Sequence, residues 1–324
     1  DKKGLSPLQP TFKAIGAIQD RKALAHYLGT TLRADVDVLN ATQYHTANFL
    51  GLWVAQDLDE PTRYAPFLLQ GGLGLPERSY YLDPSEGMAA VRTQYTTHVA
   101  AMLELASLSN VLTRAVAVVD LETRMAKAHL GREESGDVQK GDNHWTRTDF
   151  PAKAPGLDWD TFFAAAGLSK PPVFVVWQPG AVTGLSALTA EVPLDVWKDY
   201  HTFHAIQHWA AVLPKPVADQ SFTFYGKVLS GASKPLDRWK VGVALTNQAL
   251  GEAVGKAYAA KYFPPSEKAR AEQMVAHIKE AFRIRIEHLD WMSPATKAKA
   301  FAKLDALKVV VGCPDRWRVY RGLK

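Results

Sequence analysis

The sequence contains very little cysteine: Cys313 is its single thiol in 324 residues. An internal disulfide framework is therefore excluded, and so is a metal site built from several thiolates. The cysteine count leaves the cellular compartment open, because proteins without disulfides occur on both sides of bacterial membranes.

Several catalytic motifs are also absent. None of the ten histidines is followed by glutamate, so the HExxH helix of zinc peptidases does not occur. The sequence has neither a Gly-x-Ser-x-Gly nucleophile motif nor a Walker phosphate loop. No catalytic apparatus is visible in the chain.

Charge is not concentrated in blocks of one sign, and long apolar runs are interrupted. The 38 basic and 33 acidic residues are spread along the chain, which does not predict a nucleic acid partner. Residues 171–190 are uncharged and long enough to span a bilayer, but three prolines and two glycines would leave backbone groups unsatisfied in lipid. We interpret this run as a strand, a turn and a helix start, with no membrane segment.

Most of the sequence has apolar residues at helical spacing, and clusters of proline and glycine separate the helical segments. Residues 268–289 give the clearest amphipathic pattern, and Ser293-Pro294 is a typical helix start. Further helices are expected at 7–18, 21–32, 85–105, 110–129, 158–166, 184–191, 194–213 and 237–262. Strands are expected at 48–54, 64–69, 173–177 and 309–311, and loops at 131–155 and 214–236. The sequence predicts a mainly α fold with a few short β-strands.

Three histidines, His201, His204 and His208, are spaced so that one helix face would carry all of them. Paired histidines approach metals in this way, but no carboxylate is near them on that face and the neighbouring residues are apolar. A packed or surface role is favoured over a metal site.

The glycines Gly71, Gly72 and Gly74 raise the question of a phosphate-binding loop. Such a loop needs a following helix N-terminus and usually a lysine at fixed spacing, whereas Pro76 and a tyrosine pair follow here. A tight turn with positive backbone dihedrals is the favoured interpretation.

Glu122 lies among apolar residues on a helix face that should be buried. A carboxylate there must be paired or protonated, and we expect an arginine from a neighbouring helix, with a catalytic role as the less favoured alternative. Gly251 and Gly255 form a small-residue groove in a helix, which is expected to receive another helix of the protein.

Several segments taken together resemble the neprilysin family of zinc metalloendopeptidases, in the region that precedes its catalytic motif. QGGLGLPERSYYL, residues 70–82, is similar to the family pattern QGGLGLPDRDYYL almost residue for residue. The other matching segments are GLSPLQPTFKAI, WKDYHTFHAI, FTFYGKVLSG, DRWKVGVALTNQALGEAVGKAYAAKYF and LDWMSPATKAKAFAKLDALKVVVGCPDRW. They follow the family order from Gly4 to Trp317, with Cys313 in place of the usual tyrosine and Gly136 where an arginine-aspartate pair is common.

The resemblance implies two mostly helical lobes around a water-filled chamber. The family's catalytic lobe carries HExxH and a downstream glutamate as zinc ligands, while the other lobe admits only small peptides. Residues 1–236 are expected to form this helical lid lobe, and residues 237–324 the connecting helices and strand that lead toward the absent catalytic lobe. Zinc is implied for the parent enzyme and none for this chain.

We therefore expect the non-catalytic N-terminal portion of a neprilysin-type zinc metalloendopeptidase, inactive alone, whose parent cleaves oligopeptides. The resemblance assigns no catalytic or metal-binding residue to this chain, and neither it nor the sequence assigns substrate contacts. The single cysteine resembles bacterial members, which implies export to the periplasm or outside the cell, and the start at Asp1 suggests that the true N-terminus lies upstream. The alternatives are a standalone helical binding module and a metalloprotein that uses the histidine trio.

Overall fold

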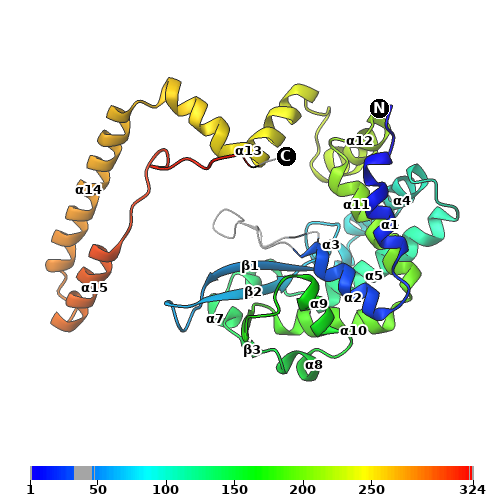
Figure 1. Cartoon of the computed structure of the whole chain (residues 1–324), viewed down its shortest axis with the longest axis horizontal. Helices are drawn as coiled ribbons and strands as arrows, with labels where there is room; N and C mark the ends of the chain where they lie inside the picture. The colour runs from blue at the N-terminus through cyan, green and yellow to red at the C-terminus, as the bar shows by residue number, and fades with distance from the viewer. Residues whose placement is uncertain (1, 33–45, 47, 321, 323–324) are drawn as a thin grey trace. The chain divides into compact units, whose positions relative to one another are not determined.

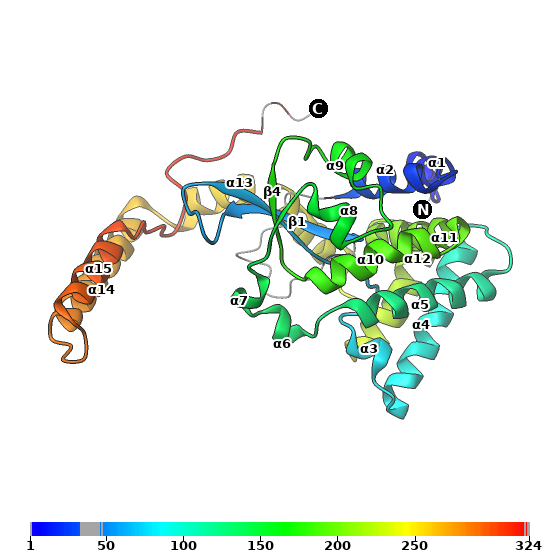
Figure 2. The ribbon, with the colours of Figure 1, turned by 90° about the horizontal axis from the view of Figure 1, so that it is seen from below.

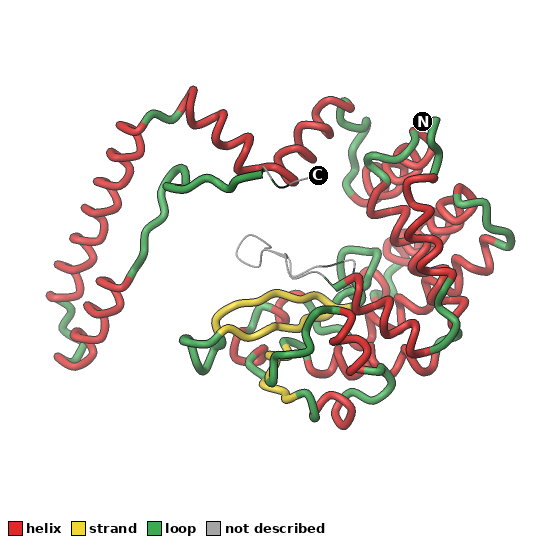
Figure 3. The backbone as a smooth tube through the Cα atoms, viewed as in Figure 1, coloured by secondary structure: helices red, strands yellow, loops and turns green. Residues whose placement is uncertain are grey.

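The computed structural model describes residues 2–32, 46, 48–320 and 322. The chain divides into two compact units, Asp1–Pro235 and Leu236–Lys324, which are described here separately. It is mainly helical with one small sheet, so the expected fold class is confirmed (Figures 1 and 3). None of the described helices has an apolar stretch long enough to cross a bilayer.

The sheet of the first unit has four strands in the order β1-β2-β4-β3. The strands are β1 (Leu50–Gln56), β2 (Tyr64–Gln70), β3 (His144–Thr146) and β4 (Val173–Val176). β1 and β2 form an antiparallel hairpin, β2 pairs with β4 in parallel, and β3 pairs with β4 antiparallel. Three of these strands lie where the sequence predicts them, and β3 lies in an expected loop.

The helices of the first unit include most of those predicted. They are α1 (Gln9–Gly16), α2 (Arg21–Thr31), α3 (Ser79–Leu82), α4 (Glu86–Leu105), α5 (Val111–Ala128), α6 (Arg132–Ser135), α7 (Val138–Gly141), α8 (Asp149–Lys153), α9 (Trp159–Ala165), α10 (Pro179–Glu191), α11 (Leu194–Trp209) and α12 (Lys215–Ser221), with a 3-10 turn at Ser6–Leu8 and a π-helix, η2, at Phe222–Leu229. The two expected loops, 131–155 and 214–236, are thus partly helical, which corrects the prediction. Helices of four or five residues are too short to produce a visible apolar period.

Helix α5 lies at the centre of the packing in the first unit. It contacts α4, α10 and α11 (Figure 2). Its buried face consists of Ala115, Val118, Leu121, Met125 and Ala126. Glu122 lies on that same buried face, so its carboxylate is positioned inside the main hydrophobic core.

A second, smaller apolar cluster covers the other face of the sheet. The Trp53 and Phe67 rings stack at 4.9 Å, and Trp177 packs edge-on against Trp53. The sheet is therefore buried on both faces.

The second unit contains α13 (Arg238–Tyr262), α14 (Pro265–Glu287) and α15 (Pro294–Ala306). The Ser293 hydroxyl accepts a hydrogen bond from the Thr296 amide and Pro294 begins α15, which confirms the predicted start. The three helices have no buried residue. The expected strand at 309–311 is wrong: no strand forms there and Val310 is 88% exposed, since a run of valines alone does not supply the partner that a strand needs.

The groove at Gly251 and Gly255 also differs from the expectation. Helix α13 is kinked at Leu250, where φ is −131° and ψ is 34°. A Cβ at Gly255 would lie 3.4 Å from the Trp317 ring, whereas Gly251 has no atom nearby. The partner of this groove is thus a tryptophan from the segment after α15, not another helix.

Candidate functional site

The glycine-rich segment of residues 70–82 leaves β2 and leads to α3. Gly72 has φ of +89°, as expected for the turn, but Gly71 and Gly74 have ordinary φ values and are needed for close packing. The Gly74 amide donates to Glu122 at 3.3 Å and the Leu75 amide to the Tyr81 hydroxyl at 2.9 Å. These amides are used inside the protein and are therefore not free to bind a phosphate.

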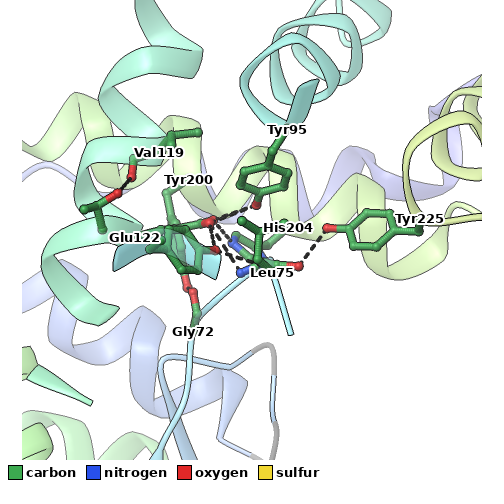
Figure 4. Close-up of polar contacts among 11 residues, drawn as sticks. Gly72, Leu75, Tyr95, Val119, Glu122, Tyr200, His204 and Tyr225 are labelled. Carbon is green, nitrogen blue, oxygen red and sulfur yellow. Dashed lines mark hydrogen bonds and ion pairs between the residues drawn. The ribbon is translucent and has the colours of Figure 1, made fainter. Parts of the chain in front are cut away.

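Four groups surround the Glu122 carboxylate at hydrogen-bond distance (Figure 4). The side chain is completely buried. Its Oε2 accepts from the Tyr81 hydroxyl at 2.6 Å, the Tyr95 hydroxyl at 2.8 Å and the Gly74 amide. Its Oε1 lies 2.8 Å from His204 Nε2. The predicted arginine partner is therefore wrong, because two phenols, an amide and an imidazole fill the place of a cation. We call Glu122, Tyr81, Tyr95, His204 and Gly74 the Glu122 hub.

Two further tyrosines attach the glycine segment to other helices. The Tyr200 hydroxyl of α11 donates to the Gly72 carbonyl at 2.7 Å, and the Tyr225 hydroxyl of η2 donates to the Gly74 carbonyl at 2.9 Å. Burial, followed by the nearby charge of Glu122, raises the pKa of Tyr81, Tyr95 and Tyr200 well above its usual value. These hydroxyls stay protonated and act as donors over the whole working pH range.

The three histidines of α11 have three different surroundings. His201 is buried between aromatic rings, His204 faces Glu122, and His208 is exposed. Over the described ranges, the side chains whose metal-ligating atoms converge are Asp59, Asp142 and His144, not this trio. The carboxylate beside His204 comes from α5, a distant part of the sequence that helical spacing cannot identify.

Burial of His201 makes stability depend on pH. The pKa of His201 is lowered to about 3 by burial and, to a smaller extent, by His204. An unfolded histidine titrates near pH 6.5, so below that pH the unfolded chain binds a proton that the folded chain does not. The stabilising effect is complete well above pH 6.5, and about 1.4 kcal/mol of it has been lost when the pH reaches 5.5.

We expect His201→Gln to reduce the slope of unfolding free energy against pH in this window, measured by urea denaturation at several pH values. His208→Gln, exposed on the same helix, is the matched control and should keep the slope. His98, whose pKa is lowered to about 4 chiefly by burial, contributes in every variant, so the difference between slopes reports His201. An unchanged slope in His201→Gln would contradict the prediction.

A cleft of about 310 Å³ lies on the outer side of the glycine segment. The polar and charged side chains in its lining include Gln70, Glu77, Arg78, Arg132 and Ser135. The Gln70 side chain is fixed to another part of the lining, because it accepts from the Leu130 amide at 2.8 Å and donates to the Leu130 carbonyl at 3.0 Å. The cleft thus offers polar groups and charges of both signs to a ligand. The buried hub holds the glycine-rich segment that forms part of its lining.

The first unit is a mainly helical region with the buried Glu122 hub inside it. Comparison with known proteins defines the class of this chain as the N-terminal region of a metallopeptidase. The chain belongs to peptidase family M13, whose N-terminal model matches residues 1–314. The expected neprilysin-type membership is confirmed.

Sequence relatives span a much longer chain. Neprilysin-3 of Drosophila melanogaster is 24% identical over 97% of this chain and 42% of its own length. Human endothelin-converting enzyme 1 is 25% identical over 84% of this chain and 36% of its own length. The chain thus spans less than half of these relatives.

Solved structures also match this chain over less than half of their own length. The crystal structure of Mycobacterium tuberculosis zinc metalloprotease ZMP1 with an inhibitor has a TM-score of 0.85 and 34% identity over 98% of this chain and 47% of that one. PEPO from Lactobacillus rhamnosis, at 19% identity and a TM-score of 0.77, shares the fold.

Proposed function

We propose that this chain is the non-catalytic N-terminal portion of a neprilysin-type zinc metalloendopeptidase that cleaves oligopeptides. In this proposal residues 1–236 form the lid lobe that limits substrate size. Residues 237–324 lead to a catalytic lobe. The observation that carries the proposal is the match to the family's N-terminal region by a chain that spans less than half of its relatives.

The exposed apolar residues of the second unit support a partner lobe. Large apolar side chains on its helices and final segment are open to solvent: Trp239, Val243, Tyr258, Tyr262, Met274, Ile278, Phe282, Ile284, Trp291, Val310 and Val319. So much exposed apolar surface in one region is typical of a surface that another part of a protein covers. We infer that the catalytic lobe of the parent enzyme covers it.

The residues of this chain do not fit the family's catalytic zinc. The sequence has no HExxH, and the histidines of α11 do not direct their nitrogens to a common point. We therefore propose that the zinc ligands and the general base lie in the catalytic lobe, and that this chain alone hydrolyses no peptide. We also infer that the parent enzyme is exported, as the family resemblance implies.

Peptide hydrolysis tests this proposal. The 324-residue chain should release no fluorescence from a quenched oligopeptide, while the same chain followed by the catalytic lobe of ZMP1 should cleave it and lose the activity to a chelator. Unfolded full-length casein should be cleaved much more slowly than the oligopeptide. Hydrolysis by the chain alone would overturn the proposed inactivity, and equal cleavage of casein and oligopeptide would overturn the size-limiting role.

A further inference from the structure

A second cluster of polar side chains lies in the first unit, away from the Glu122 hub. It joins the turn after β1 to the start of β3. His144 of β3 is at its centre, and Asp57, Asp59 and Asp142 surround the imidazole ring.

The orientation of the His144 ring is fixed by Asp57. His144 Nε2 lies 2.9 Å from Asp57 Oδ1, and Arg63 holds the other carboxylate oxygen at 2.7 Å. The backbone amides of Asp59 and Glu60 donate to Asp57 Oδ1 at 3.0 and 3.2 Å, so donors occupy both oxygens and the carboxylate is the ionised partner of Arg63. Because an ionised carboxylate only accepts, His144 Nε2 carries a proton and the neutral ring has its lone pair on Nδ1.

That lone pair faces two carboxylates. His144 Nδ1 lies 3.5 Å from Asp142 Oδ1 and 3.6 Å from Asp59 Oδ2. Two ligands on one tetrahedral zinc ion, with bonds of about 2.0–2.2 Å, lie roughly 3.4 Å apart. Both distances from His144 Nδ1 are therefore those of ligands around a single ion, and the three ligand atoms all lie within 4.8 Å of one another.

Asp142 supplies a separate observation. Its Oδ1 is buried and accepts no hydrogen bond from the part of the chain that the structure describes. A buried oxygen without a donor is costly, and here it also stands beside a second carboxylate. A cation between these atoms would remove both penalties.

We propose that Asp59, Asp142 and His144 bind a divalent zinc ion, with Asp57 positioning His144. An imidazole with two carboxylate oxygens favours zinc and related transition metals over Ca²⁺ and Mg²⁺, which prefer oxygen alone. A carboxylate that accepts from the other nitrogen of a ligating histidine is the usual support for such a ligand. Three protein ligands leave one tetrahedral position to water, on the side where Asp59 is 73% exposed.

The bound ion would tie the β1–β2 turn to the edge strand β3, two segments 87 positions apart in the sequence. Its role is structural in this unit and does not depend on the proposed peptidase function. It departs from the expectation that this chain binds no zinc.

Calorimetric titration of the chelator-treated 324-residue chain with zinc chloride tests the site. We expect one zinc per chain, and at least a tenfold weaker dissociation constant in Asp59→Asn and in His144→Gln, both of which change partly exposed side chains. Asp57→Asn should weaken binding by about 10 to 100-fold through the orientation of His144. His277→Gln, exposed on α14, is the matched control and should bind as the original chain does.

Nitrogen NMR of the imidazoles gives a second measurement that does not depend on affinity. Zinc should shift the His144 Nδ1 resonance and leave the His277 resonances in place. Absence of saturable zinc binding, or equal binding by Asp59→Asn, His144→Gln and the original chain, would overturn the proposal. A His144 ring that carries protons on both nitrogens and is unaffected by zinc would overturn it as well.

Discussion

Glu122→Ala is expected to lower the free energy of unfolding by about 4 kcal/mol, the range found when one partner of a buried charged pair is removed. The carboxylate is fully buried and receives hydrogen bonds from Tyr81, Tyr95 and Gly74, with His204 on its other oxygen. Alanine leaves two phenols, an amide and an imidazole without their acceptor in a region closed to water. The effect is therefore larger than the loss of one hydrogen bond.

Urea unfolding of the chain measures this change, and hydrogen exchange of the α5 amides assigns it to the first unit. Asp120→Ala is the matched control, because Asp120 lies on the same helix with its side chain exposed, and a change within about 0.5 kcal/mol is expected. Glu122→Gln should fall between the two, since its amide oxygen still accepts while its amide nitrogen faces donors. A loss below 1 kcal/mol in Glu122→Ala would show that the hub does not stabilise the fold.

The helices could be predicted closely where the chain marks their ends. Helix α15 begins at Pro294, as Ser293-Pro294 predicts, and α4 begins directly after its cap Ser85. Short elements carry no such signal in the sequence. Strand β3 has only three residues, and it is a strand because it pairs with β4. Local pattern is sufficient for long capped helices and insufficient for elements that depend on a neighbour.

The same distinction explains the candidate site. Burial of Glu122 follows from its apolar helix face, but its partners Tyr81 and His204 lie 41 and 82 positions away. The sequence required a partner and could not specify its type, since an arginine, two phenols or an imidazole can each satisfy a carboxylate. The segment of residues 70–82 was recognisable by resemblance, whereas the reason for Gly74 is visible only in the packed structure.

Gly74→Ala is expected to cost about 3 kcal/mol, as a combination of overpacking and a lost buried hydrogen bond. A Cβ at Gly74 would lie 1.9 Å from the Tyr95 hydroxyl and 3.2 Å from Glu122 Oε2. Tyr95 is fully buried and cannot move toward solvent, so the methyl group must displace the hydroxyl from Glu122 or push the glycine segment outward. Either change separates groups of the hub.

Gly87→Ala provides the control for the glycine itself. Gly87 lies in the exposed first turn of α4 and has open space around its Cα, so alanine there should stabilise by about 0.5–1 kcal/mol. The two substitutions add the same methyl group and should change urea stability in opposite directions. A Gly74→Ala protein as stable as the original would mean that the tight approach to Tyr95 is not needed.

A double-mutant cycle separates the steric contact from other effects of Gly74→Ala. Tyr95→Phe removes the hydroxyl that the methyl group would meet, although the ring carbon that bore it would still be 2.9 Å away. We expect the double variant to lose at least about 1 kcal/mol less than the sum of the single losses, a coupling typical of residues in direct contact. Additive losses would place the cost of alanine in the backbone of the segment instead, and would contradict the role of Gly74 as the residue that lets Tyr95 reach Glu122.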